Sequence, residues 1–131
     1  LGAQAPDGED WCYYSFPNGR RVHTTYWRCC KSSGALALEE LPLAAYAVRD
    51  GRDPVVNLLG PGGAELSTAE GPIRLEQRTG YPYDGELRIR VRAPRDAGFA
   101  LEVRVPAWAA GAACESEAGR ALEARPGSYL R

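Results

Sequence analysis

Two adjacent cysteines, Cys29 and Cys30, are the residues whose types and spacing could do chemistry. A thiolate is a strong nucleophile and a zinc ligand, and a helix N-terminus lowers the pKa of a nearby thiol. Two sulfurs do not complete a tetrahedral zinc site, so a further ligand must come from elsewhere, with Cys12 and Cys114 as candidates on composition alone. The competing interpretation is a pair of buried, inert cysteines.

The other candidate residues support more than one interpretation. His23, the only histidine, precedes Cys29 by six residues. It could assist a cysteine nucleophile, or it could be a hydrogen-bonded structural residue. Several aromatic side chains before the pair could stack on sugar rings or pack together, namely Trp11, Tyr13, Tyr14, Tyr26 and Trp27.

The elements around the pair begin with a predicted β-hairpin. Residues 11–14 and 22–27 favour short strands on either side of a Pro-Asn-Gly turn. Beyond the pair, leucines at roughly helical spacing predict a helix over about 33–48, in which Pro42 would produce a kink or a division. Asp50 and Gly51 are expected to end this helix. The cysteines would then lie at its start.

From Pro54 onward the pattern becomes that of strands. Apolar residues alternate with charged ones in three runs, around residues 73–79, 87–92 and 99–105. Such runs bury one face and expose the other, as in an antiparallel sandwich sheet, and opposed Arg and Glu residues can pair across strands. We therefore predict a mixed, mainly β fold, with one segment over residues 1–53 and an incomplete β-sandwich over residues 54–131.

The overall composition excludes several classes of protein. The hydrophobic fraction of 44% is that of a globular chain, and a net charge of −1 argues against nucleic-acid binding. No apolar run is long enough for a transmembrane helix, and no signal peptide is visible. The absence of methionine indicates an internal fragment or a trimmed chain. Adjacent cysteines that match no secreted disulfide scaffold favour reduced or metal-bound thiols, and hence a cytoplasmic protein.

Several motifs occur in a recognisable order along the chain. The run from Tyr26 to Gly34, which contains the cysteine pair, is followed by Leu41-Pro42 and Tyr46. The later motifs are Val56-Asn57-Leu58, Tyr81-Pro82-Tyr83-Asp84-Gly85, Arg104-Val105-Pro106-Ala107-Trp108-Ala109 and Pro126-Gly127-Ser128-Tyr129-Leu130. This ordered set resembles glycoside hydrolase family 127, which contains the β-L-arabinofuranosidases and many bacterial relatives.

The resemblance implies a fold and a chemistry. The first segment would be the end of a catalytic α/α barrel, followed by part of a β-sandwich. Cys29 would be the nucleophile and a zinc ligand, Cys30 a zinc ligand only, and a glutamate the acid/base of a retaining hydrolysis. The substrate would be an L-arabinofuranosyl or related sugar.

The sequence departs from the family pattern at two places. The family's remaining zinc ligands, in a Glu-x-Cys arrangement, and its acid/base glutamate lie upstream of the pair and have no counterpart here. Lys31-Ser32-Ser33-Gly34 replaces the usual proline- and asparagine-containing run. Two other functions stay open: a non-catalytic carbohydrate-binding sandwich, and a small structural zinc module that uses Cys12, Cys29, Cys30 and His23.

Overall fold

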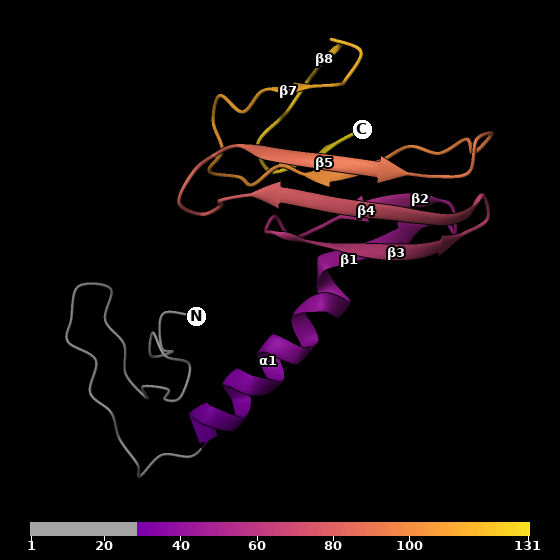
Figure 1. Cartoon of the computed structure of the whole chain (residues 1–131). Helices are drawn as coiled ribbons and strands as arrows, with labels where there is room; N and C mark the ends of the chain where they lie inside the picture. The colour runs from indigo at the N-terminus through magenta and orange to yellow at the C-terminus, as the bar shows by residue number, and fades with distance from the viewer. Residues whose placement is uncertain (1–28) are drawn as a thin grey trace. The chain divides into compact units, whose positions relative to one another are not determined.

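The structure is a computed structural model that describes residues 29–131, and the chain divides into two compact units after Pro42. Helix α1 runs from Cys29 to Ala45 and includes Pro42 without ending there (Figure 1). The predicted helix is therefore confirmed, but it begins earlier and ends earlier than expected. Tyr46 and Val48, assigned to its apolar stripe, lie in strand β1 instead. Each of them lies three residues after an apolar residue, Leu43 or Ala45, and so also fits helical spacing, which explains the error.

One sheet contains four short strands in the order β1-β2-β6-β9, which are Tyr46–Arg49, Asp53–Val56, Glu102–Arg104 and Tyr129–Leu130. The pairs β1–β2 and β6–β9 are antiparallel. The pair β2–β6 is parallel, which differs from the expected purely antiparallel sheet. Parallel pairing is possible here because β6 is reached only after the chain has formed the whole second sheet.

The turn between β1 and β2 explains the mistaken helix end. Asp50 and Gly51 both have positive φ, at 51° and 69°, and the N–H of Arg52 donates to the Arg49 carbonyl over 3.0 Å. Two successive positive φ angles are typical of a type I′ hairpin turn, for which Asp-Gly is a preferred sequence. The dipeptide thus closes a hairpin and does not stop a helix.

The second sheet is antiparallel throughout, in the order β3-β4-β5. Its strands are Gly62–Thr68, Gly71–Thr79 and Leu87–Arg92, which lie side by side in Figure 1. A further two-stranded sheet pairs β7, Cys114–Glu115, with β8, Ala121–Leu122. The alternation predicted for β4 and β5 is confirmed over most of both strands, because their arginines are exposed while Ile73, Leu75 and Ile89 are more buried. Val91, between two arginines near the end of β5, is exposed at 37%.

The core lies between the two larger sheets. Val56 from β2 and Ile73 and Leu75 from β4 are almost completely buried. Partly buried side chains from both sheets and their connections pack around them: Tyr46, Leu59, Leu66, Ile89, Phe99, Leu101 and Val103. This shared core confirms a mainly β arrangement in which two sheets pack face to face.

Strand β2 is buried along its whole length, including the carboxyl group of Asp53. The N–H of Ala100 donates to Asp53 Oδ1 over 3.1 Å and is the main cause that holds the pKa of Asp53 below its ordinary value of 3.8. Burial opposes this shift, whereas Arg52 and Arg131 reinforce it, the latter by an ion pair of 3.0 Å to Oδ2. Asp53 is thus a charged group whose partners come from three parts of the chain.

Glu102 in β6 was expected on a solvent-facing side of its strand, but it is only 5% exposed. Its Oε2 atom lies 2.7 Å from Arg49 Nη2, and the Arg49 guanidinium also lies over the Tyr129 ring at 5.9 Å. Arg49 belongs to β1, on the opposite side of β2 from β6. The long arginine therefore covers the carboxylate, which a strand alternation pattern cannot reveal.

Asn57, the first residue after β2, connects β2 to the last turn of α1. Its N–H donates to the Ala45 carbonyl over 2.9 Å, and its side-chain Nδ2 donates to the Ala44 carbonyl over 3.2 Å. Its Oδ1 accepts a 2.7 Å hydrogen bond from the Tyr129 hydroxyl. These carbonyls at the helix end have no partner within the helix itself, so Asn57 acts as a C-terminal cap.

Replacement of Asn57 by alanine is expected to destabilise the β unit. Asn57→Ala removes the Nδ2 and Oδ1 hydrogen bonds, and the expected loss is about 1–2 kcal/mol of unfolding free energy in urea titration. Tyr129→Phe, which removes only the hydroxyl partner, should cost less. An Asn57→Ala variant as stable as the unchanged protein would contradict this role.

The pH dependence of stability should report on Asp53. Because its folded-state pKa is lowered, its contribution is complete above the unfolded pKa and is lost as the pH falls through the folded value. Urea unfolding at a series of pH values from 7 to about 2 should show this loss. Asp53→Asn should be less stable at pH 7 and should flatten the acid decline. Glu123→Gln, at an exposed carboxylate paired with Arg125, is the matched control and should change the profile little.

Candidate functional site

The two cysteines lie in the first turn of α1, which begins at Cys29. The backbone N–H groups of a first helical turn have no partner within the helix and carry the positive end of its dipole. Such a position favours a thiolate over a neutral thiol. The predicted placement of the pair at a helix start therefore agrees with the observed backbone, whereas the roles predicted for the two sulfurs stay predictions.

The remaining predicted ligands are not brought together in the described part of the chain. Cys114 lies in β7, half-buried, beside Glu115. Among residues 29–131, no three or more His, Cys, Asp or Glu side chains gather as a group that could hold a metal ion. Cys12, His23 and the five aromatic residues named as possible sugar-stacking groups lie outside the described residues, as do both strands of the predicted hairpin.

An exposed aromatic pair forms a second candidate site in the β unit. The rings of Tyr81 and Trp108 stack with centroids 6.1 Å apart and planes 9° from parallel. Trp108 is 69% exposed, and Tyr83 nearby in the sequence is 97% exposed. Exposed flat rings of this kind can pack against the apolar face of a sugar ring.

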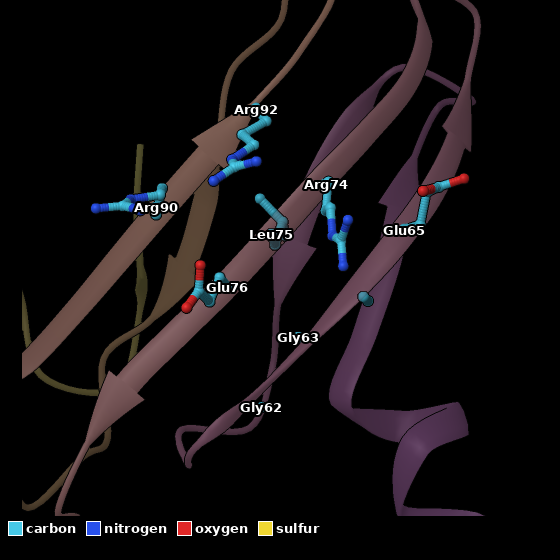
Figure 2. Close-up of a pocket in the computed structure, with 9 residues that line it drawn as sticks. Gly62, Gly63, Glu65, Arg74, Leu75, Glu76, Arg90 and Arg92 are labelled. Atoms are coloured by element: carbon cyan, nitrogen blue, oxygen red, sulfur yellow. The ribbon is translucent and has the colours of Figure 1, made fainter.

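An arginine-lined hollow forms a third candidate site, on the outer face of β3, β4 and β5 (Figure 2). It has a volume of about 610 Å³, and its charged side chains are Arg74, Arg90 and Arg92 together with Glu65 and Glu76. Glu76 is held as a carboxylate, because a hydrogen bond from Arg78 lowers its pKa and Arg90 and Arg92 add to the effect, against a smaller opposing effect of burial. The alternation pattern predicted only that these arginines are solvated strand residues, and it did not predict the hollow.

Residues 55–131 match a sequence model described as "Beta-L-arabinofuranosidase, GH127 middle domain". The chain belongs to glycoside hydrolase family 127. This finding confirms the family that the ordered motifs of the sequence predicted. No curated protein matches the chain.

Solved structures of glycoside hydrolases share the fold. A protein called "Glycoside hydrolase" is 25% identical and superposes with a TM-score of 0.76 over 98% of this chain. A β-L-arabinofuranosidase of the family from Geobacillus stearothermophilus T6 is 22% identical, with a TM-score of 0.76 over 99% of the chain. A further β-arabinofuranosidase of the family is 25% identical, with a TM-score of 0.72 over 99%. The chain spans 24% of the length of each of these structures.

Most of the motifs that predicted the family make contacts within the β unit. Asn57 caps α1, and Tyr81 and Trp108 stack on each other. The 104–109 and 126–130 motifs join through Val105, whose N–H donates to Ser128 over 2.8 Å and whose carbonyl accepts from Gly127 over 3.0 Å. These motifs therefore identify the family through its folding contacts. Among the described residues, no helix is long and apolar enough to cross a membrane.

Proposed function

We propose that the chain is part of a retaining glycoside hydrolase that acts on β-L-arabinofuranosyl or related sugars, with Cys29 as its nucleophile. The observation that carries this proposal is the family match over residues 55–131. The position of Cys29 at the start of α1 supports the assignment of the nucleophile, because a thiolate is the reactive form of cysteine.

The two sulfurs suit zinc by their chemistry. Thiolates are preferred zinc ligands, and Cys29 and Cys30 would supply two of the four that a tetrahedral site requires. Residues 29–131 contain no group of three or more side chains that could hold a metal ion. The remaining ligands would therefore come from outside these residues. When bound, Zn²⁺ keeps a coordinated thiol deprotonated at neutral pH. Both roles require reduced thiols, which a cytoplasmic location would preserve.

The proposed reaction proceeds in two steps at Cys29. The Cys29 thiolate attacks the anomeric carbon, a carbon–sulfur bond forms, and the glycosidic carbon–oxygen bond breaks as a glutamic acid protonates the leaving oxygen. The same glutamate then takes a proton from water, which displaces the sulfur and regenerates the thiolate. Two displacements at one carbon retain its configuration, as in carboxylate-based retaining enzymes. The glutamate would lie elsewhere in the protein.

Exposed leucines along α1 support the proposal that a longer protein surrounds this helix. Leu36 and Leu43 are 57% and 82% exposed, and Leu38 and Leu41 also count among the exposed large hydrophobic residues. Contiguous exposed apolar residues usually mark a covered surface. We propose that residues 1–53 are the end of the family's catalytic α/α barrel and residues 54–131 part of the following sandwich, since the chain spans 24% of its structural relatives.

Substitution of Cys29 tests the nucleophile in the protein that contains this chain. Cys29→Ser should lower kcat for an aryl β-L-arabinofuranoside by about 10³-fold or more, because serine lacks a thiolate at neutral pH. Mass spectrometry of the unchanged protein, quenched during turnover, should detect a pentosyl group on the peptide with Cys29. Cys114→Ser is the matched control and should retain normal turnover. Full activity of Cys29→Ser would disprove the assignment.

Metal analysis tests the role of Cys30 separately. Cys30→Ser should lower the bound zinc per protein molecule and raise the apparent thiol pKa of Cys29, measured by alkylation rate against pH. An unchanged zinc content in both the Cys29→Ser and Cys30→Ser variants would exclude the pair as a zinc site.

The 131-residue chain alone should show no measurable turnover of the same aryl glycoside. The proposed acid/base glutamate and two zinc ligands would be missing from it. Steady-state assays at high protein concentration would check this expectation, with the longer protein as the positive control. Turnover by the 131-residue chain that Cys29→Ser abolishes would show that these partners lie within it.

A non-catalytic carbohydrate-binding function is the second candidate, and the exposed Tyr81–Trp108 stack favours it. In that case Trp108→Ala should abolish glycan binding, whereas Cys29→Ser should leave it intact. Titration of neutral arabinan oligosaccharides into both variants separates the two functions. Loss of turnover without loss of binding in Cys29→Ser would instead favour the enzyme.

A further inference from the structure

We propose that the hollow on the outer face of β3, β4 and β5 binds the carboxylate of an acidic sugar through Arg74 and Arg92, with Arg90 beside them. The proposal rests on the proposed function only for the class of polymer, a glycan. The site itself rests on strand register, ion pairing and the shape of the hollow.

The register of β4 and β5 places Arg74 directly opposite Arg92. Directly opposed residues in an antiparallel pair point to the same face with Cβ atoms about 5 Å apart, and like charges there destabilise the sheet. Figure 2 shows the two side chains on adjacent strands. Their guanidinium groups can therefore reach one small anion between them.

A second arginine pair on the same strands provides a comparison. Arg78 lies opposite Arg88 in the same register, but each has its own carboxylate partner. Arg78 Nη2 lies 2.6 Å from Glu76 Oε1, and Arg88 Nε lies 2.7 Å from Glu86 Oε1. The repulsion between these two arginines is thus offset within the sheet.

In the described part of the chain, the Arg74–Arg92 pair has no carboxylate bonded directly to either arginine. Glu76 attracts Arg92 at longer range, but it accepts its hydrogen bond from Arg78. Within the described residues, no ion pair involves Arg74, Arg90 or Arg92. Glu65 lies opposite Arg74 on β3, but its carboxylate points away from the guanidinium in Figure 2. The hollow thus contains three arginines and two carboxylates, Glu65 and Glu76. A bound anion would give Arg74 and Arg92 the directly bonded partner that neither of them has.

The third strand leaves room for that anion. Gly62 and Gly63 of β3 carry no side chains and form one margin of the hollow. An added Cβ at Gly63 would lie 2.5 Å from the Leu75 carbonyl oxygen, so no larger residue can occupy this position without a shift of the backbone. The close approach of β4 therefore requires glycine at position 63, whereas an added Cβ at Gly62 would meet nothing within 4 Å. A flat ring can approach the sheet at Gly62 while its substituent reaches the arginines on β4 and β5.

Charge and residue type select the ligand. Arginine presents a planar fork of donors that matches a carboxylate in two parallel hydrogen bonds. A nucleic acid would require a broad cationic surface, whereas the chain has a net charge of −1. The polymer that a glycoside hydrolase binds is a glycan, and a uronic acid is the sugar that carries a planar carboxylate directly on its ring, which matches the arginine fork.

Calorimetric titration of trigalacturonate into the protein that contains this chain tests the proposal. We expect measurable binding at about 50 mM salt, where surface charges are weakly screened, and weaker binding as salt rises. The Arg74→Gln, Arg92→Gln double variant should bind at least about tenfold more weakly, since two charge-assisted contacts are lost. Arg88→Gln, an arginine on β5 paired with Glu86, is the matched control and should bind within about twofold of the unchanged protein.

Two further ligands identify the chemistry. The fully methyl-esterified trisaccharide, which has no charge, should bind at least about tenfold more weakly than the acid. Inorganic phosphate should bind more weakly than trigalacturonate. Equal affinity for acid and ester, phosphate binding as tight as trigalacturonate, or unchanged binding by the double variant would each overturn the proposal.

Stability and activity separate this site from folding and from catalysis. The ligand-free double variant should melt no lower than the unchanged protein, because it loses a repulsive pair. Trigalacturonate should raise the melting temperature of the unchanged protein but not that of the double variant. Cys29→Ser should bind trigalacturonate normally, so a failure of the catalytic proposal would leave this binding in place. Loss of trigalacturonate binding in the Cys29→Ser variant would contradict the proposal that the ligand binds on β3, β4 and β5.

Discussion

Complete burial of β2 is the constraint on which the rest of the β unit depends. A strand buried on all sides must have every polar group paired, because an unpaired group would lose its water without compensation. Asp53 meets this requirement through Ala100, Arg52 and Arg131. Just beyond the strand, Asn57 donates a hydrogen bond to a carbonyl at the end of α1. The groups at the two ends of one four-residue strand thus tie together chain segments that are distant in sequence.

The proposed nucleophile and the observed hydrogen-bonded framework lie in different parts of this chain. The predicted nucleophile lies in the first turn of α1, whereas the described hydrogen bonds of the β unit hold the last turn through Asn57. The family motifs in the sandwich contact each other, because Tyr81 stacks on Trp108 and Val105 is hydrogen-bonded to Ser128. A match to the middle domain of the family therefore identifies the framework, while the proposed catalytic residues depend on α1 and on protein beyond it.

The sequence predicted the features that a local pattern determines. Alternation located β4 and β5, and leucine spacing located α1, since each pattern reflects which side chains face the core. Tyr46 and Val48 were misassigned because each also lies three residues after an apolar residue, which fits a helix until the Asp50-Gly51 turn is known to close a hairpin. The burial of Glu102 and the hollow beside Arg74 could not be predicted, because both depend on which strands become neighbours. Sequence spacing contains no information about a pairing such as that of β2 with β6.

The core face that the alternation predicted for β4 also determines where the unpaired arginines lie. Ile73 and Leu75 are buried at 0% and 1% exposure, and a shift of β4 by one residue would turn both toward water. The register that buries them necessarily places residue 74 opposite residue 92 on the outer face. Packing therefore fixes the positions, but it does not fix the residue types. A glutamate at either position would form an ion pair like those of Arg78 and Arg88, so two arginines there reduce the stability of the sheet in exchange for an open cationic site.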